Sequence, residues 1–419
     1  MSGRRPTIVA TPVLRDALSA CAWKQPLDVP MKVAHFISYL GRKHGGPVFG
    51  VAAYTAALAD AGCDVELFNV FQDADGERIG IEPRVKVMTC RNSEAGAFRR
   101  CSEFWRTVRL VQGTVIHSHG LWTDINRLAG VLARRQRLPH ILAPCGMLAA
   151  KALRHRWWKK LPARIWFQTR ALKEASCLHA KSEEELGDIR RFGLRNPVAI
   201  IPNPILLPPE PARMSAEEFR RVFSIAPEKG ILLYLGRLHP VKGVPRLVQA
   251  WADLREFHAR WNLVVAGPDE RNFRRGFEML AAKRGCENSV MFLGELDDFT
   301  KWGAYAAAQV FVMPSDFENF GNSIVEAMLS GLPVVTTTGT PWRQLPKENA
   351  GWWVDPVSEA LTAALREALE MPQDRRRTMG EQAARLVSQY QAPQAVANLL
   401  QIYRWLLGQG PSPACVRLG

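Results

Sequence analysis

From Met31 onward, short apolar runs alternate with longer stretches of helical periodicity. Residues 48–61, for example, form an amphipathic stretch between two such runs. Continuous apolar strands separated by helices indicate a parallel sheet that is covered by helices on both faces. The strands predicted in the first half lie at residues 32–38, 65–70, 115–118, 140–144, 177–180 and 199–202.

A proline-rich segment interrupts this alternation. Residues 202–211 read PNPILLPPEP, and prolines at this density favour an extended connector over a helix or a strand. A chain of 419 residues also suits two domains better than one core. We therefore predict an α/β fold of two doubly wound parallel-sheet domains that face each other across a cleft. The strands predicted in the second half lie at residues 231–235, 262–266, 289–293, 310–313, 333–337 and 352–354.

These patterns set the expected domain boundaries. The N-terminal domain spans residues 31–207, the C-terminal domain spans residues 208–392, and a helical pattern at 393–408 is followed by a tail at 409–419. Residues 1–30 are expected to be an N-terminal extension. Their apolar stretch is interrupted by proline and by charged residues, which makes a poor secretory signal.

Charge and cysteine content narrow the setting in which the protein works. The chain holds 55 basic and 40 acidic residues, a formal net charge of +15. This excess favours phosphate-bearing substrates, nucleic acid or an anionic membrane surface, and composition alone does not choose among them. The eight cysteines form no Cys-x-x-Cys pair, which argues against a zinc site and predicts a reduced, cytoplasmic compartment. No window of about 18 apolar residues predicts a membrane-spanning helix.

Part of the basic excess is concentrated at residues 151–173. Basic residues there are interleaved with tryptophans, a composition typical of a segment that lies at a membrane interface. Two alternatives stay open: a helix that buries its tryptophans in the first domain, or a surface that stacks nucleic-acid bases. Against the second, the cations elsewhere are dispersed and no nucleic-acid recognition module is found. The residues concerned are Arg154, His155, Arg156, Trp157, Trp158, Lys159, Lys160, Arg164, Trp166 and Arg170.

Polar residues follow the predicted strands at their carboxyl ends, where open parallel sheets bind ligands. Gly45 and Gly46 come after the first strand and open a helix, so the backbone can approach an anion there. A loop that merely needs a positive φ is the alternative. His119 lies at the tip of the strand at 115–118, where an imidazole could hydrogen-bond a substrate hydroxyl. His117, one pleat earlier, is expected to be structural.

Two cations follow the first strand of the second half. Arg237 and Lys242 lie in the segment LGRLHPVKG, and such a pair at a strand tip can hold a diphosphate without a metal. The alternative is a pair of solvated surface cations. Asp73 and Asp75, an Asp-x-Asp pair in a polar loop far from the other candidates, are interpreted as surface residues rather than metal ligands.

The segment PSDFENFGNSIVEA, residues 314–327, carries the strongest signal. A strand ends before it and a helix starts near Ser323, so free backbone N–H groups would face an anion. Glu318 lies in the polar loop and can reach a ligand, whereas Glu326 lies in the first turn of the helix. Glu326 has an alternative role, because Ser323-x-x-Glu326 is also the spacing of a capping box. The other candidate binding residues of this segment are Asn319, Phe320, Gly321 and Asn322.

Taken in order, these motifs resemble the retaining glycosyltransferases of family 4, which have the GT-B fold of two Rossmann-like domains. The resemblance runs from Met31 to about residue 407. Thr-Pro-Trp at 340–342 and Gly-Trp-Trp-Val at 351–354 are similar to a subgroup of bacterial surface-polysaccharide and lipopolysaccharide enzymes. The other matching motifs are Gly-Gly at 45–46, His-Ser-His-Gly-Leu-Trp at 117–122, Gly-Met-Leu at 146–148, Ile-Pro-Asn at 201–203, Leu-Gly-Arg-Leu-x-x-x-Lys-Gly at 235–243, Ala-Gly-Pro at 266–268 and Pro-Ser-x-x-Glu-Asn-Phe-Gly at 314–321.

The resemblance implies a role for each candidate residue. Glu318 is similar to the glutamate that contacts the transferred sugar, and Glu326 to the glutamate that binds the nucleotide ribose. His119 matches a histidine near the reacting sugar and the acceptor. The implied catalytic residues are thus His119 and Glu318, and the implied donor-binding residues are Gly45, Gly46, Arg237, Lys242, Asn319, Phe320, Gly321, Asn322 and Glu326.

The implied reaction moves a sugar from a nucleoside-diphosphate sugar to a hydroxyl with retention of the anomeric configuration. No cofactor and no metal are implied, because protein cations take the metal's place. The N-terminal domain would hold the acceptor, the C-terminal domain would hold the donor, and the last helix would cross back to the N-terminal domain. The expected acceptor is a lipid-linked glycan or polysaccharide precursor at the inner face of the cytoplasmic membrane, and nucleic acid is not an expected partner. A sugar-nucleotide epimerase or hydrolase of the same fold is the alternative.

Two positions depart from the family's pattern. Cys145 stands where a basic residue is expected, so the contacts to the acceptor should differ there. Pro204 stands where the family usually has glycine, and we expect it to stiffen the connector between the domains.

Overall fold

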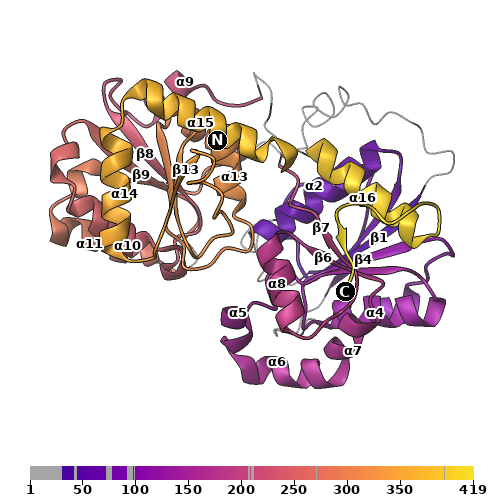
Figure 1. Ribbon diagram of the computed structural model, residues 1–419. Coiled ribbons are helices and arrows are strands. Elements are labelled where there is room, and N and C mark those ends of the chain that lie inside the picture. Colours follow the sequence, from indigo (N-terminus) through magenta and orange to yellow (C-terminus); the bar gives the residue numbers. More distant parts are fainter. Residues whose placement is uncertain are drawn as a thin grey trace, which may run out of the picture. The chain divides into compact units, whose positions relative to one another are not determined.

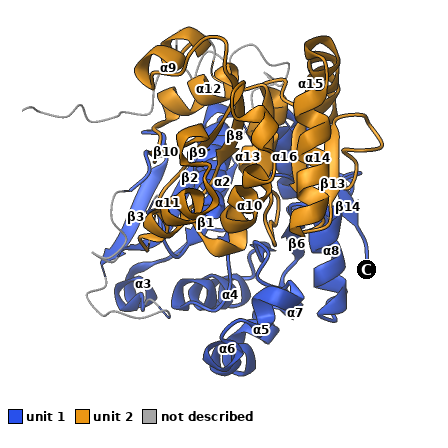
Figure 2. Cartoon of the chain, turned by 90° about the vertical axis from the view of Figure 1, so that its left-hand side faces the viewer, with its two compact units in different colours: residues 1–206, 390–419 blue, residues 207–389 orange. Residues whose placement is uncertain are grey.

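The computed structural model divides the chain into two compact units (Figure 1). Unit 1 contains Met1–Leu206 together with Tyr390–Gly419, and unit 2 contains Leu207–Gln389 (Figure 2). The predicted N-terminal extension and the pair Asp73 and Asp75 lie outside the described residues. The described residues are 31–41, 45–71, 78–91, 98, 100–205, 208, 212–269, 271–390 and 392–419.

Unit 1 is built on an eight-stranded sheet. Its strands are β1 (Lys32–Ile37), β2 (Asp64–Phe71), β3 (Lys86–Arg91), β4 (Val115–His119), β5 (His140–Ala143), β6 (Cys177–Ala180), β7 (Val198–Ile200) and β14 (Val416–Arg417). They are arranged in the order β14-β7-β6-β5-β4-β1-β2-β3, and only the pair of β14 and β7 is antiparallel. The order reverses between β1 and β4, so the carboxyl ends of these strands form the switch point at which such sheets bind ligands.

Helices cover both faces of this sheet because β1 is apolar on both sides. Val33 and Ile37 belong to a core on the side of α2 and α16, whereas Ala34 and Phe36 belong to a core on the side of α3 and α4. Alternate residues of a strand point to opposite faces, which explains the continuous apolar run in the sequence. The helices of unit 1 are α2 (Gly46–Asp60), α3 (Ser102–Thr107), α4 (Asp124–Gln136), α5 (Ala150–Arg154), α6 (Trp157–Ala163), η3 (Arg164–Gln168), α7 (Thr169–Glu174), α8 (Glu183–Arg191) and α16 (Ala392–Leu406).

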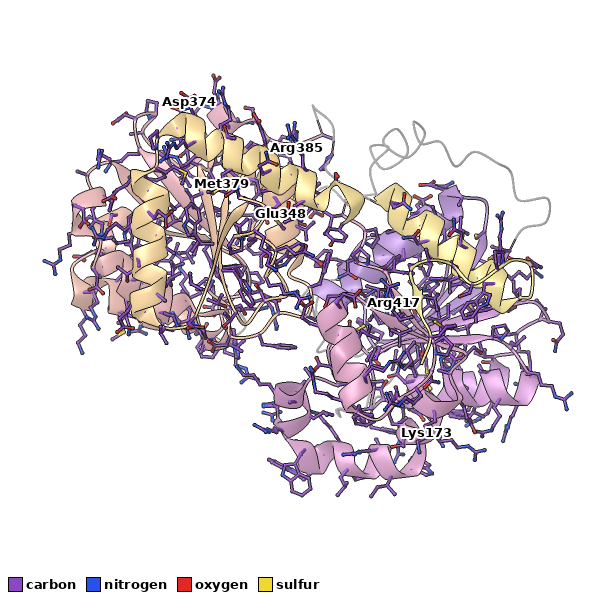
Figure 3. All side chains as sticks on the ribbon, in the orientation of Figure 1. Lys173, Glu348, Asp374, Met379, Arg385 and Arg417 are labelled. Carbon is purple, nitrogen blue, oxygen red and sulfur yellow. The ribbon has the colours of Figure 1, made fainter. Side chains whose placement is uncertain are left out.

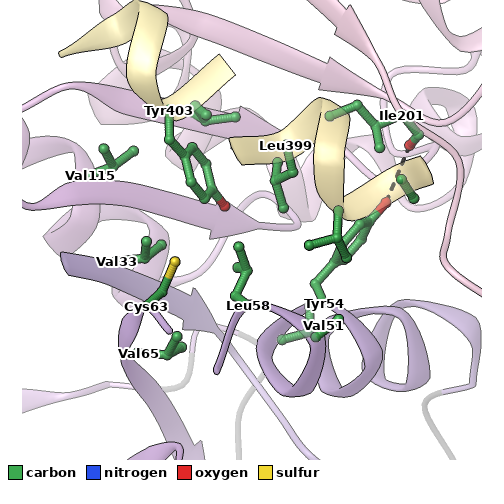
Figure 4. Packing of buried hydrophobic residues seen from close by; sticks show 14 of the residues in the cluster. Val33, Val51, Tyr54, Leu58, Cys63, Val65, Val115, Ile201, Leu399 and Tyr403 are labelled. Carbon is green, nitrogen blue, oxygen red and sulfur yellow. Dashed lines mark hydrogen bonds between the residues drawn. The ribbon is translucent and has the colours of Figure 1, made fainter. Parts of the chain in front are cut away.

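The last helix, α16, returns to unit 1, as the resemblance implies. Leu399 and Tyr403 of α16 pack in one buried cluster with Val51 and Leu58 of α2 (Figure 4). The Tyr403 hydroxyl also lies 2.8 Å from Nδ1 of His117 in β4. The C-terminal segment therefore completes the core of the domain that the chain begins with, and the predicted tail goes on to form β14 at the sheet edge.

Unit 2 repeats the design with six parallel strands. They are β8 (Gly230–Leu235), β9 (Trp261–Ala266), β10 (Val290–Gly294), β11 (Val310–Met313), β12 (Val334–Thr337) and β13 (Gly351–Val354). Their order is β10-β9-β8-β11-β12-β13, so the switch point lies between β8 and β11. The helices are α9 (Ala216–Val222), η4 (Pro240–Lys242), α10 (Val244–Ala252), η5 (Arg255–Phe257), α11 (Phe273–Arg284), η6 (Glu287–Ser289), α12 (Asp298–Ala307), α13 (Asn322–Leu329), α14 (Ser358–Glu370), α15 (Gln373–Val387) and η7 (Ser388–Tyr390).

The two doubly wound sheets confirm the predicted fold class. The strand pattern missed β3 and β14, which lie at the two edges of the unit 1 sheet. Edge strands are half-covered, so their sequences lack the continuous apolar run of central strands. No helix in the described part of the chain combines the length and the hydropathy that crossing a bilayer requires.

Candidate active site

Two loops lie side by side at the carboxyl edge of the unit 2 sheet. β8 and β11 are neighbours at the switch point, so the segments after Leu235 and Met313 leave the sheet together. The backbone N–H of Asp316 donates a 2.8 Å hydrogen bond to the carbonyl of Val241, which joins the two loops directly. The predicted cations and glutamates of unit 2 therefore share one neighbourhood.

The close approach of the two loops depends on a glycine. Gly243 has a φ of 77°, and a Cβ at this position would lie 1.9 Å from the carbonyl oxygen of Pro314. Any other residue would force the loops apart. Arg246 of α10 then fixes the second loop, because it donates to the Pro314 carbonyl at 2.9 Å and pairs with Asp316 at 2.7 Å.

Lys242 and Glu318 form an ion pair in this neighbourhood. Nζ of Lys242 lies 2.5 Å from Oε1 of Glu318, and the two side chains are only 13% and 14% exposed. The alternative of a solvated surface cation is therefore wrong for Lys242. Arg237 lies half-buried after β8, and its carbonyl accepts a 2.9 Å hydrogen bond from the Tyr234 hydroxyl. Burial, followed by the charge of Glu318, raises the pKa of Tyr234 well above its usual value.

Glu326 is held by two side chains of α12. Its Oε1 accepts from Nζ of Lys301 at 3.0 Å, and its Oε2 accepts from the Tyr305 hydroxyl at 2.9 Å. The helix α13 has Gly321 as its N-cap and shows no capping bond from a side chain, so the capping-box alternative is wrong. Sequence reasoning missed Lys301 and Tyr305. Their i, i+4 spacing puts both on one face of α12, but nothing local to α12 indicates that this face meets Glu326.

The start of α13 suits an anion. Gly321 adopts a φ of 82°, and the first turn of α13 carries no acidic side chain. Helix N-termini of this kind present backbone N–H groups and a partial positive charge. Phe320 lies buried beside Trp342, whose indole N–H donates a 2.8 Å hydrogen bond to the Phe320 carbonyl. The Phe320 side chain thus anchors the loop by packing.

The corresponding loop of unit 1 opens α2 after β1. Gly45 is the N-cap of α2 with a φ of 70°, and Gly46 and Pro47 begin the helix. No acidic residue lies in its first turn. This geometry fits an anion-binding helix start, and it equally fits a turn that only needs a positive φ.

His119 ends β4 beside β1, but its side chain is only 3% exposed. Its Nε2 lies 3.0 Å from Nδ1 of His35. Burial, followed by the charges of His35 and Lys181, lowers the pKa of His119 well below its usual value, so the imidazole is neutral. A contact from His119 to a sugar stays a prediction. His117 is enclosed between Tyr403 and other buried rings, as expected of a structural residue.

The buried histidines also bear on the question of a metal. Ring nitrogens of His35, His117 and His119 lie within 4.8 Å of one another, a spacing at which three imidazoles can hold an ion. Both nitrogens of His117 are engaged, by Tyr403 at 2.8 Å and by His179 at 3.1 Å. Nε2 of His35 is buried and has no partner among the described residues. The expectation that the protein needs no metal therefore stays a prediction.

The departure at Cys145 lies close to a buried cation that sequence reasoning missed. Cys145 adopts a φ of 55°, and burial raises the pKa of its thiol to about 11, so the thiol is neutral. Lys181, which follows β6, is 5% exposed, and burial lowers its pKa to about 8. The next backbone N–H, of Gly146, donates to Glu185 at 2.6 Å. The one signal in the sequence for Lys181 was the position of this lysine at the carboxyl end of β6.

Two family models match the chain, one in each unit. Residues 45–204 match a model described as a glycosyl transferase 4-like domain, and residues 215–386 match one described as glycosyl transferases group 1. The chain belongs to the family 4 glycosyltransferases. The two matches fall on the two sheets described above, which confirms the resemblance seen in the motifs.

Curated relatives of this glycosyltransferase match part of their length. The O-antigen chain mannosyltransferase B of Escherichia coli is 34% identical over 151 residues, which cover 34% of this chain and 37% of the relative. A GDP-mannose:cellobiosyl-diphosphopolyprenol alpha-mannosyltransferase of Komagataeibacter xylinus is 30% identical over 195 residues, which cover 46% of this chain and 49% of the relative. The chain thus aligns with less than half of each relative.

Solved structures show the same fold over about nine-tenths of the chain. The sucrose-phosphate synthase of Thermosynechococcus elongatus has a TM-score of 0.72 at 22% identity and covers 90% of this chain and all of its own. WaaG, a glycosyltransferase involved in lipopolysaccharide biosynthesis, has a TM-score of 0.66 at 20% identity. The match covers 88% of this chain and 99% of WaaG. At these identities the likeness establishes the GT-B fold alone.

Proposed function

We propose that this glycosyltransferase moves a sugar from a nucleoside-diphosphate sugar to a hydroxyl acceptor. The observation that carries the proposal is the largely buried ion pair of Lys242 and Glu318, in the same two loops as Arg237 and the start of α13. A diphosphate needs cations and backbone N–H donors, and a bound sugar needs a hydrogen-bond acceptor. This neighbourhood supplies all three kinds of group.

A donor diphosphate would compete with Glu318 for Lys242. Lys242 and Glu318 neutralise each other in their ion pair. A diphosphate carries more negative charge than one carboxylate, so Lys242 would turn from Glu318 to the donor. Glu318 would then be released to accept hydrogen bonds from the transferred sugar. Arg237 and the N–H groups at the start of α13 would complete the clamp and stabilise the charge of the leaving diphosphate.

Glu326 is the proposed ribose-binding residue. A carboxylate has about four lone-pair positions, and Lys301 and Tyr305 take two of them. Each oxygen therefore keeps an acceptor site, which suits two neighbouring ribose hydroxyls. The adjacent ammonium group of Lys301 balances the negative charge of the carboxylate.

The proposed reaction proceeds with retention and without a metal. The bond from the anomeric carbon to the diphosphate oxygen breaks, the acceptor hydroxyl attacks from the same face, and its proton passes to the departing diphosphate oxygen. No carboxylate then has to act as a covalent nucleophile, which leaves Glu318 to orient the sugar. Unit 1 would hold the acceptor, with the neutral His119 near the reacting atoms, and Gly45 and Gly46 would approach the donor diphosphate.

The acceptor is proposed to be a lipid-linked glycan or polysaccharide precursor, used at the inner face of the cytoplasmic membrane. In support, one relative is named for a cellobiosyl-diphosphopolyprenol acceptor and another for O-antigen chains. The donor nucleotide is left open, because one relative is named for GDP-mannose and one solved neighbour holds UDP and glucose.

Acceptor-dependent release of nucleoside diphosphate tests the proposal. A thermal-shift screen of nucleotide sugars first finds the donor, since a bound donor raises the melting temperature by mass action. We then expect diphosphate release only when an acceptor is added. Equal release without an acceptor would identify a hydrolase, and a changed sugar on an intact nucleotide would identify an epimerase.

A further inference from the structure

The segment after α5 carries two apolar stripes on opposite sides. α6, η3 and α7 form one continuous helical segment, Trp157 to Glu174, at the outer edge of unit 1 (Figures 1 and 2). One stripe, Ala163, Phe167 and Ala171, is buried in unit 1. The tryptophans do not belong to this buried stripe, so the alternative that buries them in the first domain is wrong.

The second stripe faces away from the core. Ile165 is 75% exposed, Trp157 57%, Trp158 58% and Leu161 38%. The spacing of i, i+4 and i+8 puts Trp157, Leu161 and Ile165 on one side of the helix, and Trp158 is the neighbour of Trp157 along the chain. Five of the thirteen large hydrophobic residues exposed in the described part of the chain fall within residues 157–166. We call Trp157, Trp158, Leu161 and Ile165 the Trp–Ile face.

Trp166 has a different role. Its ring stacks on Phe98 at 6.2 Å, and the guanidinium of Arg127 lies 4.4 Å from the ring and 4.3 Å from the ring of Trp105. This aromatic and cationic stack ties η3 to α4. Trp166 therefore holds the segment in place, whereas the Trp–Ile face has no protein partner of this kind among the described residues.

The surroundings of the Trp–Ile face are cationic. Residues 151–173 contain eight lysines and arginines and no aspartate or glutamate. Arg170 is paired with Glu174, and Lys160 donates to the backbone carbonyls of Ala152 and His155. In the described structure no carboxylate pairs with Lys151, Arg154, Arg156 or Lys159, all of which are exposed. Side chains of this edge extend away from the sheet in Figure 3, where Lys173 marks the end of the segment.

We propose that the Trp–Ile face binds an anionic lipid bilayer. Tryptophan and isoleucine gain free energy in the headgroup and upper acyl region, and a helix with such a face lies in the plane of the interface. Each nearby lysine or arginine adds attraction to anionic lipid. An apolar face ringed by unpaired cations fits a bilayer surface that is apolar beneath and negative on top.

This inference rests on the proposed function, because the lipid-linked acceptor is the reason for the enzyme to bind a membrane. A lipid-linked acceptor presents its reacting hydroxyl at the membrane surface, so an enzyme held there meets it by diffusion in two dimensions. The Trp–Ile face belongs to unit 1, the unit proposed to hold the acceptor. Binding by this face needs no helix that crosses the bilayer, in agreement with the helices described.

Flotation with vesicles tests the proposal on the full chain. We expect the protein to float with vesicles of equal parts phosphatidylglycerol and phosphatidylcholine, and to stay at the bottom with phosphatidylcholine alone. The variant Trp157→Ser with Ile165→Ser should lower the partition coefficient at least about tenfold, since each substitution removes a large apolar side chain that the bilayer would bury. Met279→Ser, at a residue of α11 that is 65% exposed, is the matched control and should float like the parent.

Charge is tested separately. Arg154→Gln with Lys159→Gln should lower binding about 25-fold at low salt, since each cation contributes about fivefold, and added salt should narrow the difference in binding between variant and parent. Lys283→Gln, at an exposed cation of α11, is the control. Because all these positions are exposed, unchanged melting temperatures will show that the variants fold.

Several outcomes would overturn the inference. It fails if the parent does not float, if Met279→Ser weakens binding as much as the double variant, or if the face instead mediates self-association, seen as a dimer that the double variant dissolves. Donor binding is measured in the thermal-shift assay without vesicles. This measurement distinguishes a failure of the membrane inference from a failure of the proposed transferase function. Loss of flotation with intact donor binding ends the membrane inference alone, and flotation without any donor binding ends the proposed transferase reaction alone.

Discussion

Replacement of Lys242 with alanine probes the proposed diphosphate clamp. Lys242 and Glu318 are 2.5 Å apart and about one-seventh exposed, so the ammonium group sits in a setting where water competes poorly. Lys242→Ala removes the cation that would turn to the donor. It also leaves the carboxylate of Glu318 largely buried without its partner, next to the incoming negative charge.

The size of the effect follows from these contacts. A hydrogen bond to a charged group contributes about 1.5–3 kcal/mol, and a loss of this size weakens donor binding about 10- to 150-fold. The freed carboxylate of Glu318 repels the diphosphate, which moves the expected value toward the upper end. Glu318→Gln in the same background removes this repulsion, so the double variant should recover part of the lost affinity.

Isothermal titration calorimetry with the nucleoside diphosphate measures the effect. Lys283→Ala is the matched control, because Lys283 lies in the last turn of α11, which leads into the amino end of β10 and so to the edge of the sheet opposite Lys242. The control should bind as the parent does. An unaltered affinity in folded Lys242→Ala would refute the clamp.

Three further predictions concern the other groups. Glu318→Ala should abolish transfer while donor binding survives; loss of binding in a folded variant would contradict this division of roles. Tyr305→Phe should weaken binding of the nucleoside diphosphate about fivefold and Glu326→Gln at least tenfold, because the first removes a hydrogen bond that positions the Glu326 carboxylate and the second removes its negative charge; unchanged affinity of both folded variants for the nucleoside diphosphate would argue against ribose recognition. The free energy of unfolding, measured by urea titration, should fall as pH drops from 6.5 towards 4, because burial lowers the pKa of His140 to about 4 and the unfolded chain binds the proton first. His140→Gln should reduce that slope by up to about 1.4 kcal/mol per pH unit, and an unchanged slope would show that His140 is not buried as a neutral ring.

The sequence was sufficient for the architecture because central strands of a parallel sheet are apolar on both faces. β1, with Ala34 and Phe36 on one side and Val33 and Ile37 on the other, shows this directly. The loops after β8 and β11 could also be identified, since polar residues at strand ends are local features. Their contact, which places Lys242 on Glu318, follows from strand order.

Other features depend on contacts between distant segments. The spacing from Ser323 to Glu326 is the same for a capping box and for a ligand-binding glutamate, and only the approach of Lys301 and Tyr305 from α12 decides between them. The segment at residues 157–171 presented a similar ambiguity. It has apolar residues at i, i+4 spacing on two sides, so periodicity alone could not tell which side unit 1 buries.

Nuclear magnetic resonance of the transferred sugar tests the central claim most directly. The donor, an acceptor and the enzyme are incubated with EDTA, and the anomeric proton of the donor is followed together with the released nucleoside diphosphate. We predict that a single anomeric signal appears for the product, that it has the configuration of the donor, and that it grows in step with the released diphosphate. EDTA should not change the rate of this reaction. An inverted signal, free sugar without an acceptor, or a reaction that EDTA stops would contradict it.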